Sequence, residues 1–436
     1  MGGSGSDAAR QTNGAAGQKA APEGVDSDGP GPGGVTPEGK DAGEGGGDAG
    51  DTAETRYDML EAKMKEIPLR EGGTPAQRER AEQCVRVFKD YIDSRTLLAA
   101  LMFPANEAQC GEELLRRVQL VLTSAPLFVD SPYVGSILSD VLWQCMGTAA
   151  GWELFGDARG SEQVKRLLDV WVEYLDSPGS LNVVVDAPQG WLSAPARSAL
   201  KMDDYAWDPA DPKGHGGFSS WNAFFSRRLV DPSVRPIDAG SNIVTSPCDA
   251  EVVGLDADID CSNATLIVKE RSYSLLQLFG GDESLAAYFE HGHVLQAFLS
   301  TLRFHRWLAP CAGRVESVRR IAGSYIGSRR SVQARKGLSE NAALRYIAHA
   351  QTRGLVVIIM ESGLRVAILL VGMVEVSSVV FSVKEGDIVA KGQDFGTFQY
   401  GGSTSLVFLP RAANASATVR IGDVIEAGNS IFRLAD

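Results

Sequence analysis

The chain has 436 residues, 44% of them hydrophobic, which is enough for two or three domains with a sizeable apolar core. Its 55 acidic and 42 basic residues give a formal net charge of −13, which argues against a nucleic-acid-binding protein, because such proteins carry a basic patch. The six cysteines form no CxxC pair, so neither a disulfide scaffold nor a structural zinc site is expected. The longest apolar stretch, 355–374, is interrupted by Glu361 and Arg365, and we therefore expect no transmembrane segment.

Residues 1–55 have the composition of a disordered, acidic, glycine-rich tail. They contain 16 glycines, 10 acidic residues, 3 basic residues and no aromatic side chain. Such a segment cannot bury enough apolar surface to offset the entropy that it would lose on ordering. It has the pattern of neither a signal peptide nor a transit peptide. Met1-Gly2 followed by Ser6 matches a loose N-myristoylation pattern, and whether Gly2 is acylated stays open.

The region that follows the tail has helical periodicity. Apolar residues recur at steps of three and four in 84–92, 134–146 and 164–175, with prolines and glycines between these segments. The pattern predicts five or six helices, which form an N-terminal helical domain over residues 57–185. We expect its large aromatic side chains in the core, namely Trp143, Trp152, Phe155 and Trp171.

From about Gly240 the sequence changes to short runs typical of β-strands. Such runs occupy 266–268, 356–360, 366–371, 376–383 and 405–409, and turns rich in glycine and aspartate separate them. They predict an antiparallel sheet or a barrel-like domain over residues 186–436. The fold class is therefore α+β, with a helical domain followed by a β-rich domain.

Two segments of the β-rich region repeat at an offset of 36 residues. Val383-x-x-Gly386-Asp387 and its continuation to Gly392 return as the segment from Val419 to Gly428. We interpret both as Gly-Asp turns between strands, in which glycine supplies a positive φ. They resemble the turns of biotinyl- and lipoyl-type half-barrels, but the lysine of a carrier domain is missing.

The sequence Gly401-Gly402-Ser403-Thr404 carries the strongest chemical signal. A phosphate-binding loop would need a lysine and a following helix, and a hydrolase nucleophile elbow would need Gly-x-Ser-x-Gly; neither pattern is present. A third interpretation is self-cleavage of the backbone, in which the Ser403 hydroxyl attacks the carbonyl of Gly402. Glycine leaves that carbonyl sterically open and tolerates a strained backbone.

Several separate motifs occur in the order typical of the phosphatidylserine decarboxylase family, and the chain resembles this family over residues 218–434. The segments that carry the resemblance are Phe224–Arg228, Val234–Ile237, Ser246–Ala250, Phe304–Pro310, Lys391–Phe398 and Gly402–Thr404. Further segments resemble the noncanonical branch of the family that includes tryptophan decarboxylases, and they extend the resemblance to residues 57–436. These are Phe289–Leu299, Trp307, the doubled glycine before Ser403, Ala125–Leu127 and the stretch 171–192.

The resemblance implies an Asp-His-Ser triad for self-cleavage, with one departure in this chain. Asp249 and Ser403 occupy two of the triad positions, but Leu308 stands where the family has the triad histidine. Leucine cannot transfer a proton, and a positioned proton-transfer group contributes about 10²–10⁴-fold. His305, His291 and His293 are the candidates for a substitute base.

The resemblance also implies the cofactor and the reaction. Cleavage between Gly402 and Ser403 would yield a β chain of residues 1–402 and an α chain of residues 403–436, with Ser403 converted to a pyruvoyl group. That group is an electron sink for decarboxylation, the role otherwise played by pyridoxal phosphate. His305 is implied to return the proton to the substrate carbon, and no metal is required.

Three functions stay open at this point. The first is decarboxylation of a free, aromatic L-amino acid, and the second is decarboxylation of phosphatidylserine to phosphatidylethanolamine in phospholipid biosynthesis. The third is an uncleaved pseudoenzyme, which Leu308 favours. We expect a cytoplasmic protein, either free or peripheral to a membrane, that takes a small amino acid or phosphatidylserine and no nucleic acid. Assembly into a homo-oligomer stays open.

Overall fold

We describe a computed structural model of the chain. It describes residues 69–95, 107–130, 137–138, 141–142, 149–259, 274–323, 352–372, 378–399 and 403–435. The expected disordered tail, the Gly2 acylation pattern and the β-type run at 266–268 lie outside these ranges. Residues 51–436 form one compact unit, and everything below concerns that unit.

Helices dominate the first half of this unit, as the periodicity predicts. The α-helices are α2 (Pro75–Asp93), α4 (Glu107–Val121), α6 (Ala149–Gly156), α7 (Ala158–Leu175), α8 (Ala194–Leu200), α9 (Trp221–Phe225), α10 (Leu275–Leu278) and α11 (Glu283–Phe289). Short 3₁₀ helices occupy Pro178–Val183, Met202–Asp204, Pro232–Val234 and Arg411–Ala413. None of the helices in the described ranges is both long and apolar enough to cross a membrane.

The longer helices follow from caps and amphipathic spacing. Thr74 and Gln77 form a capping box at the start of α2, and Asp157 caps α7 by accepting a hydrogen bond from Gly160. The apolar side chains of α2 and α7 are buried together with the predicted core residues Phe155 and Trp171. The side chains of Trp143 and Trp152 lie outside the described part of the structure.

One feature of the helical region was not predicted. Strand β1 (Leu69–Glu71) pairs with β2 (Ser124–Pro126) in an antiparallel two-stranded sheet. Each strand has only three residues, which is too short to show the alternation by which strands are recognised in a sequence. Trp171 fixes this small sheet to α7, because its indole nitrogen donates a hydrogen bond to the Ser124 carbonyl at 2.9 Å.

The second half of the unit is built from antiparallel strands, so the fold is α+β. The strands are β3 (Ile243–Thr245), β4 (Ala250–Asp256), β5 (His293–Leu299), β6 (Arg306–Leu308), β7 (Gly313–Ile321), β8 (Arg353–Ile359), β9 (Arg365–Gly372), β10 (Ser378–Phe381), β11 (Ile388–Val389), β12 (Asp394–Gln399), β13 (Ser403–Leu409), β14 (Ser416–Ala417), β15 (Val424–Ile425) and β16 (Ser430–Arg433). Eight of them form one sheet in the order β11-β7-β8-β9-β13-β5-β4-β15, and two three-stranded sheets have the orders β10-β12-β6 and β14-β16-β3.

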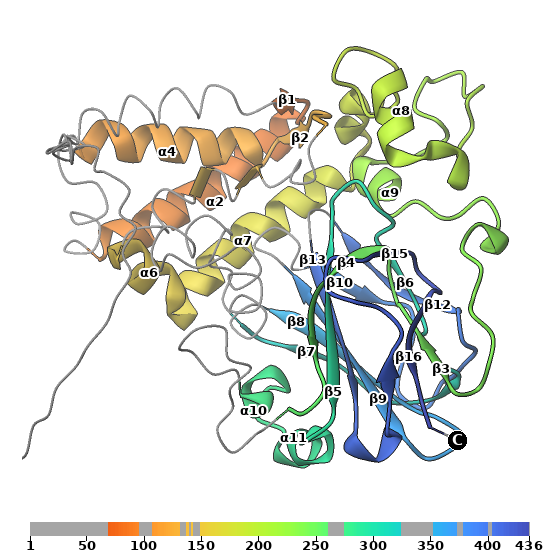
Figure 1. The fold of residues 1–436 in the computed structure, drawn as a ribbon. Coiled ribbons are helices and arrows are strands. Elements are labelled where there is room, and N and C mark those ends of the chain that lie inside the picture. The colour runs from red at the N-terminus through yellow and green to blue at the C-terminus, as the bar shows by residue number, and fades with distance from the viewer. Residues whose placement is uncertain are drawn as a thin grey trace, which may run out of the picture. The chain divides into compact units, whose positions relative to one another are not determined.

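The eight-stranded sheet is covered on both faces. On one face, alternate residues of β5, β9 and β13 pack with apolar residues of the two smaller sheets. On the other face, the intervening residues pack against α10 and α11, which lie at the lower edge of the sheet in Figure 1. This alternation places successive residues of β13 in two different environments.

The repeated Gly-Asp segments form matching turns, as predicted. Gly392 and Gly428 have φ of 79° and 94°, which is the left-handed region that favours glycine. A Cβ atom added to either glycine would come within 2.7 Å of the side chain of the same residue, Ile237. Both turns therefore pack closely against Ile237, two residues after Arg235.

Candidate active site

The sequence motifs that lie far apart in the chain meet next to β12 and β13. The Leu308 amide donates a hydrogen bond to the Pro247 carbonyl at 2.8 Å, which joins the segments 246–250 and 304–310. The Phe398 amide donates to the His305 carbonyl at 2.9 Å, which joins the latter segment to the end of β12. These two hydrogen bonds therefore bring the segments 246–250 and 304–310 and the end of β12 together.

Ser403 is the first residue of β13. It pairs with Leu299, the last residue of β5, and with Gly372, the last residue of β9. Strand β12, which is hydrogen-bonded to His305, ends at Gln399. Ser403 follows four residues later in the chain. The Gly402 side of the bond that we expect to be cleaved lies outside the described residues.

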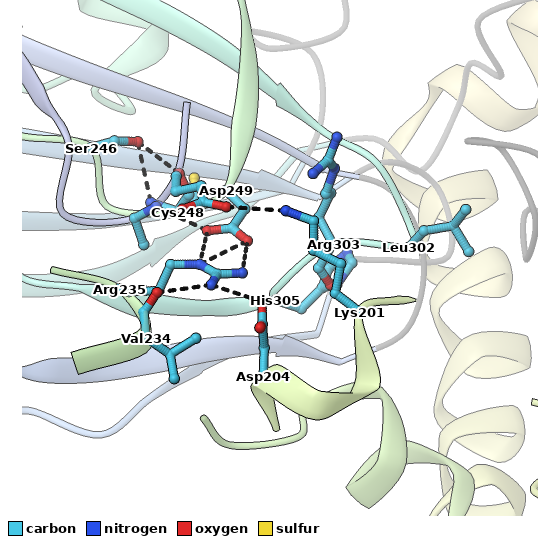
Figure 2. Close-up of polar contacts among 12 residues, drawn as sticks. Lys201, Asp204, Val234, Arg235, Ser246, Cys248, Asp249, Leu302, Arg303 and His305 are labelled. Atoms are coloured by element: carbon cyan, nitrogen blue, oxygen red, sulfur yellow. Dashed lines mark hydrogen bonds and ion pairs between the residues drawn. The ribbon is translucent and has the colours of Figure 1, made fainter. Parts of the chain in front are cut away.

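Asp249 is buried and is held by an arginine. Its carboxylate is 1% exposed and accepts hydrogen bonds from Nε (3.0 Å) and Nη2 (2.8 Å) of Arg235 and from the Ala427 amide (2.9 Å). On its other side, Arg235 Nη1 donates to Asp204 at 3.0 Å, so one guanidinium joins two carboxylates (Figure 2). Burial lowers the pKa of Arg235, but the hydrogen bonds that it donates to Asp249 and Asp204, together with the charge of Asp249, outweigh this effect and leave the pKa raised.

Sequence reasoning did not identify Arg235 as part of the site. The residue stands in the Val234–Ile237 motif, but the motif does not show that its side chain reaches Asp249, 14 residues away. A side-chain pairing across this distance depends on how the turns around Ile237 fold, and the sequence carries no direct signal for it.

His305 is 1% exposed and has a fixed orientation. Its Nδ1 lies 2.8 Å from the carbonyl of Arg303, and its ring centroid lies 4.1 Å from that of Phe225. A carbonyl can only accept, so Nδ1 carries the proton in this contact and Nε2 is the basic nitrogen of the neutral ring. Thr397 Oγ1 also donates to the His305 carbonyl at 2.9 Å.

Leu308, which stands where the resemblance implies the triad histidine, has a buried apolar side chain. Its side chain is 7% exposed and belongs to the hydrophobic core of the helical region, together with Phe304 and Ala427. The Ala427 amide donates a hydrogen bond to Asp249, and the Leu308 amide donates to the carbonyl of Pro247, two residues before Asp249. Arg235, and not a histidine, is the charged partner of Asp249 here.

The structure does not bring His291 and His293 to Ser403. His293 begins β5 and pairs with Leu409, whereas Ser403 pairs with the opposite end of that strand. Six residues of extended chain separate the two ends, or roughly 20 Å. His291 lies in the turn before β5 and contacts Asp258 through Nδ1 at 2.8 Å. We therefore correct the expectation that either histidine substitutes for the missing base.

Cys248 contacts β13, and sequence reasoning did not identify it as part of the site. Its Sγ lies 3.3 Å from the Ser405 hydroxyl, and both side chains are buried. Burial raises the pKa of the Cys248 thiol to about 12, so the group is a neutral thiol at physiological pH. It is therefore no substitute for the missing base.

Arg227 places a second buried guanidinium beside the His305 segment. It lies over the Tyr205 ring, 4.2 Å from its centroid, and donates to the Leu302 carbonyl at 3.3 Å. Burial lowers the pKa of this arginine. The contact anchors the Phe224–Arg228 motif to the loop that orients His305.

In the described ranges, no group of three His, Cys, Asp or Glu side chains is placed to hold a metal ion.

Comparison with known proteins agrees with this assembly of motifs. Two phosphatidylserine decarboxylase family models match, one over residues 221–433 and the other over residues 82–200. Decarboxylase iboD of Amanita muscaria is 33% identical over 287 residues, which cover 61% of this chain and 81% of that protein. The chain belongs to the phosphatidylserine decarboxylase family. It is therefore a decarboxylase, that is, a carboxy-lyase.

Two further relatives show the breadth of this family. An L-tryptophan decarboxylase of Psilocybe cubensis is 28% identical over 387 residues, which cover 79% of this chain and 86% of that protein. A phosphatidylserine decarboxylase proenzyme of Chlamydia trachomatis is 31% identical over 195 residues, covering 44% of this chain and 61% of that protein. The resemblance to a branch with tryptophan decarboxylases is thus confirmed.

Proposed function

We propose that this protein is a pyruvoyl-dependent decarboxylase that cleaves itself between Gly402 and Ser403 and acts on a free L-amino acid. The observation that supports the proposal is a chain of contacts. The segment of Asp249 is bonded to Leu308, the His305 carbonyl is bonded to β12, and Cys248 contacts Ser405 of β13. Family membership supplies the reaction type, and the position of Ser403 supplies the cleavage point.

The proposed cleavage balances as an acyl shift followed by an elimination. The Ser403 hydroxyl oxygen adds to the carbonyl carbon of Gly402, the amide bond breaks, and the Ser403 nitrogen takes up a proton. Elimination of the resulting ester releases the Gly402 carboxylate and leaves a carbon–carbon double bond at residue 403. Water then displaces that nitrogen as ammonia and leaves a pyruvoyl group at the new N-terminus.

His305 is the residue that we assign to proton transfer. Its backbone carbonyl accepts hydrogen bonds from Phe398 and Thr397 of β12, which stand four and five residues before Gly402. The Arg303 carbonyl holds its Nδ1 proton, so Nε2 is the atom that accepts or returns a proton. Asp249, bound by Arg235, fixes the segment 246–250 against Leu308.

Conversion of Ser403 would leave a carbonyl group at the start of β13. The next residue, Thr404, has a buried hydroxyl that makes no hydrogen bond within the described residues. Side chains alternate along a strand, so this hydroxyl lies on the face of β13 opposite to residue 403, and we assign it no role in the reaction. When present, the pyruvoyl group would supply the electron sink for loss of CO₂.

A free amino acid is the substrate that we favour over a lipid. The matched region extends through the helical part of the chain in the tryptophan decarboxylase of Psilocybe cubensis, whereas the match to the bacterial phosphatidylserine decarboxylase proenzyme covers less than half of the chain. The acidic net charge also opposes binding to an anionic bilayer, where basic residues contribute attraction. An aromatic amino acid is the first candidate.

Release of CO₂ tests this preference. The purified, processed protein is offered tryptophan, phenylalanine and tyrosine in parallel with phosphatidylserine vesicles, and Ser403→Ala protein serves as the blank. We expect CO₂ and the matching amine from at least one free amino acid and none from the blank. Turnover of the vesicles with no amine from any free amino acid would reverse the order of the two substrates.

Leu308 favours a second candidate function, that of an uncleaved binding protein. A buried leucine at the triad position cannot act as a base, and it packs with the helical core. In that case the chain would stay intact and release no CO₂ from any of these compounds.

A further inference from the structure

The segment 201–205 lies outside the sequence motifs but beside the candidate site. It follows α8 and includes a 3₁₀ helix. Two of its residues, Met202 and Tyr205, are buried in the apolar core that also contains Leu308 and Ala427. The segment is therefore held in the same core as the residue that stands at the triad-histidine position.

Asp204, in this segment, binds the arginine that holds Asp249. Its carboxylate accepts a hydrogen bond from Arg235 Nη1 at 3.0 Å, while Nε and Nη2 of the same guanidinium donate to Asp249 at 3.0 and 2.8 Å. Figure 2 shows the guanidinium between the two carboxylates. The donors of arginine form a rigid planar fork, so a contact at one edge of the fork fixes the direction of the other. Asp204 therefore fixes the orientation in which Arg235 holds Asp249.

The surroundings of Arg235 make this contact important. The Arg235 side chain is 3% exposed and that of Asp204 is 27% exposed, and hydrogen bonds are stronger where little water competes. Without Asp204, the acceptor that remains for Nη1 among the described residues is the Val234 carbonyl at 3.2 Å. Loss of Asp204 would therefore leave one edge of a buried guanidinium on a single neutral acceptor.

A second contact of the segment reaches the other donor to Asp249. Lys201 Nζ lies 3.4 Å from a carboxylate oxygen of Glu426, and the next residue, Ala427, donates its amide to Asp249 at 2.9 Å. The ion pair is partly exposed, so it contributes little to stability. It shows that the segment is aligned with both groups that bind Asp249, the guanidinium and the amide.

A third contact connects Asp249 to the strand of Ser403. Cys248 precedes Asp249, and its Sγ lies 3.3 Å from the Ser405 hydroxyl. Ser405 stands two residues after Ser403, so the two serine side chains lie on the same face of β13. A change in the orientation of Asp249 would therefore be transmitted through Cys248 to the strand that begins with Ser403.

From these contacts we infer that Asp204 is a positioning residue for self-cleavage, and that it acts through Arg235 on Asp249. The inference rests on the proposed function and adds to it a residue from outside the sequence motifs. The resemblance gives Asp249 a role in cleavage and His305 the role in decarboxylation. Loss of Asp204 should therefore slow the first reaction and leave the second unchanged.

Asp204→Asn tests the inference, with Asp203→Asn as the matched control. The change keeps the size of the side chain and removes its charge, and Asp203 is the exposed neighbour of Asp204 in the chain. Full-length chains are synthesised in a cell-free system, and a time course on a denaturing gel gives the rate of cleavage. We expect Asp204→Asn to slow cleavage about tenfold, the effect of weakening one hydrogen bond between charged groups, and the control to leave the rate unchanged. Equal rates for the two variants would overturn the inference.

A second readout separates positioning from a general loss of structure. After cleavage is complete, CO₂ release from tryptophan, phenylalanine, tyrosine and phosphatidylserine vesicles is measured per mole of α chain. We expect the Asp204→Asn protein to match the wild type, because His305 keeps its contacts with the Arg303 carbonyl and with β12. Equal losses in cleavage and in CO₂ release would show a structural defect and contradict the positioning role.

Two further variants test whether the effect passes through Arg235. Asp204→Asn should slow cleavage no further when it is added to Arg235→Met, because the contact is already lost. A further tenfold loss in that background would overturn the inference. Asp204→Glu retains the carboxylate and should cleave faster than Asp204→Asn, and this comparison is decisive if the Arg235→Met chain does not fold. Equal rates for Asp204→Glu and Asp204→Asn would contradict a role for the charge at residue 204.

The wild-type chain distinguishes this inference from the proposed function. A wild type that stays uncleaved would defeat the proposed function itself. A wild type that cleaves, with Asp204→Asn protein cleaving at the same rate, would leave the proposed function intact and defeat only the role of Asp204.

Discussion

Replacement of His305 by alanine should slow both the cleavage of the chain and the release of CO₂ by about 10²–10⁴-fold, the usual contribution of a positioned proton-transfer group. The imidazole is buried, its Nδ1 is fixed by the Arg303 carbonyl, and its backbone is tied to β12. A time course of the two fragments on a denaturing gel measures the first step, and CO₂ release from pre-cleaved protein measures the second.

His293→Gln is the matched control for this prediction. His293 lies at the end of β5 opposite to Ser403, so its replacement should leave both rates unchanged. A large loss on His293→Gln, with none on His305→Ala, would contradict the placement of the two histidines and restore the discarded substitute base.

Leu308→His completes the test, because it places at residue 308 the histidine that the resemblance implies for the triad. If His305 works alone in the natural chain, the added histidine should speed cleavage, and it should restore cleavage to the His305→Ala chain at least in part. No cleavage in any of these variants would favour the uncleaved binding protein instead.

Replacement of Arg235 by methionine should lower the free energy of unfolding by about 3–5 kcal/mol, the cost of leaving a buried carboxylate without its partner. Asp249 is 1% exposed, and its hydrogen bonds come from Arg235 and the Ala427 amide. Urea denaturation followed by tryptophan fluorescence measures the change. Arg228→Met is the control, because Arg228 is exposed and stands in the neighbouring motif, and it should change stability little.

A double variant separates the ion pair from a general packing defect. Arg235→Met combined with Asp249→Asn removes the uncompensated charge, so it should be more stable than the sum of the two single changes predicts. Simple additivity would show that the buried charge is not the cause of the instability. Cleavage should be slow in either case, because the segment 246–250 loses its anchor.

Local pattern was sufficient for the main elements of the fold. The three- and four-residue spacing of apolar residues predicts α2 and α7, and the short β-type runs at 366–371 and 405–409 predict β9 and β13; these elements appear in the structure. The three-residue strands β1 and β2 were missed because they are too short for any periodicity. The boundary between the helical and β-rich domains near residue 185 stays a prediction.

The site was predictable only as a set of motifs. The sequence identified the segments that contain Asp249, His305 and Ser403, and the backbone hydrogen bonds between them explain why these segments occur together. It did not show the Arg235 pairing, the Cys248–Ser405 contact or the distance of His293 from Ser403. Each of these depends on strand register or on turn geometry, which link residues too far apart for a local pattern to record.

Intact mass spectrometry of the purified wild-type protein tests the central claim most directly. Self-cleavage predicts a 34-residue peptide, 403–436, that carries a pyruvoyl group in place of an amino-terminal serine, is blocked to Edman degradation and reacts with hydrazines. The Ser403→Ala protein should show one uncut chain. A wild-type protein that keeps the full mass of its 436 residues after prolonged incubation, with no hydrazine-reactive carbonyl, would contradict the account.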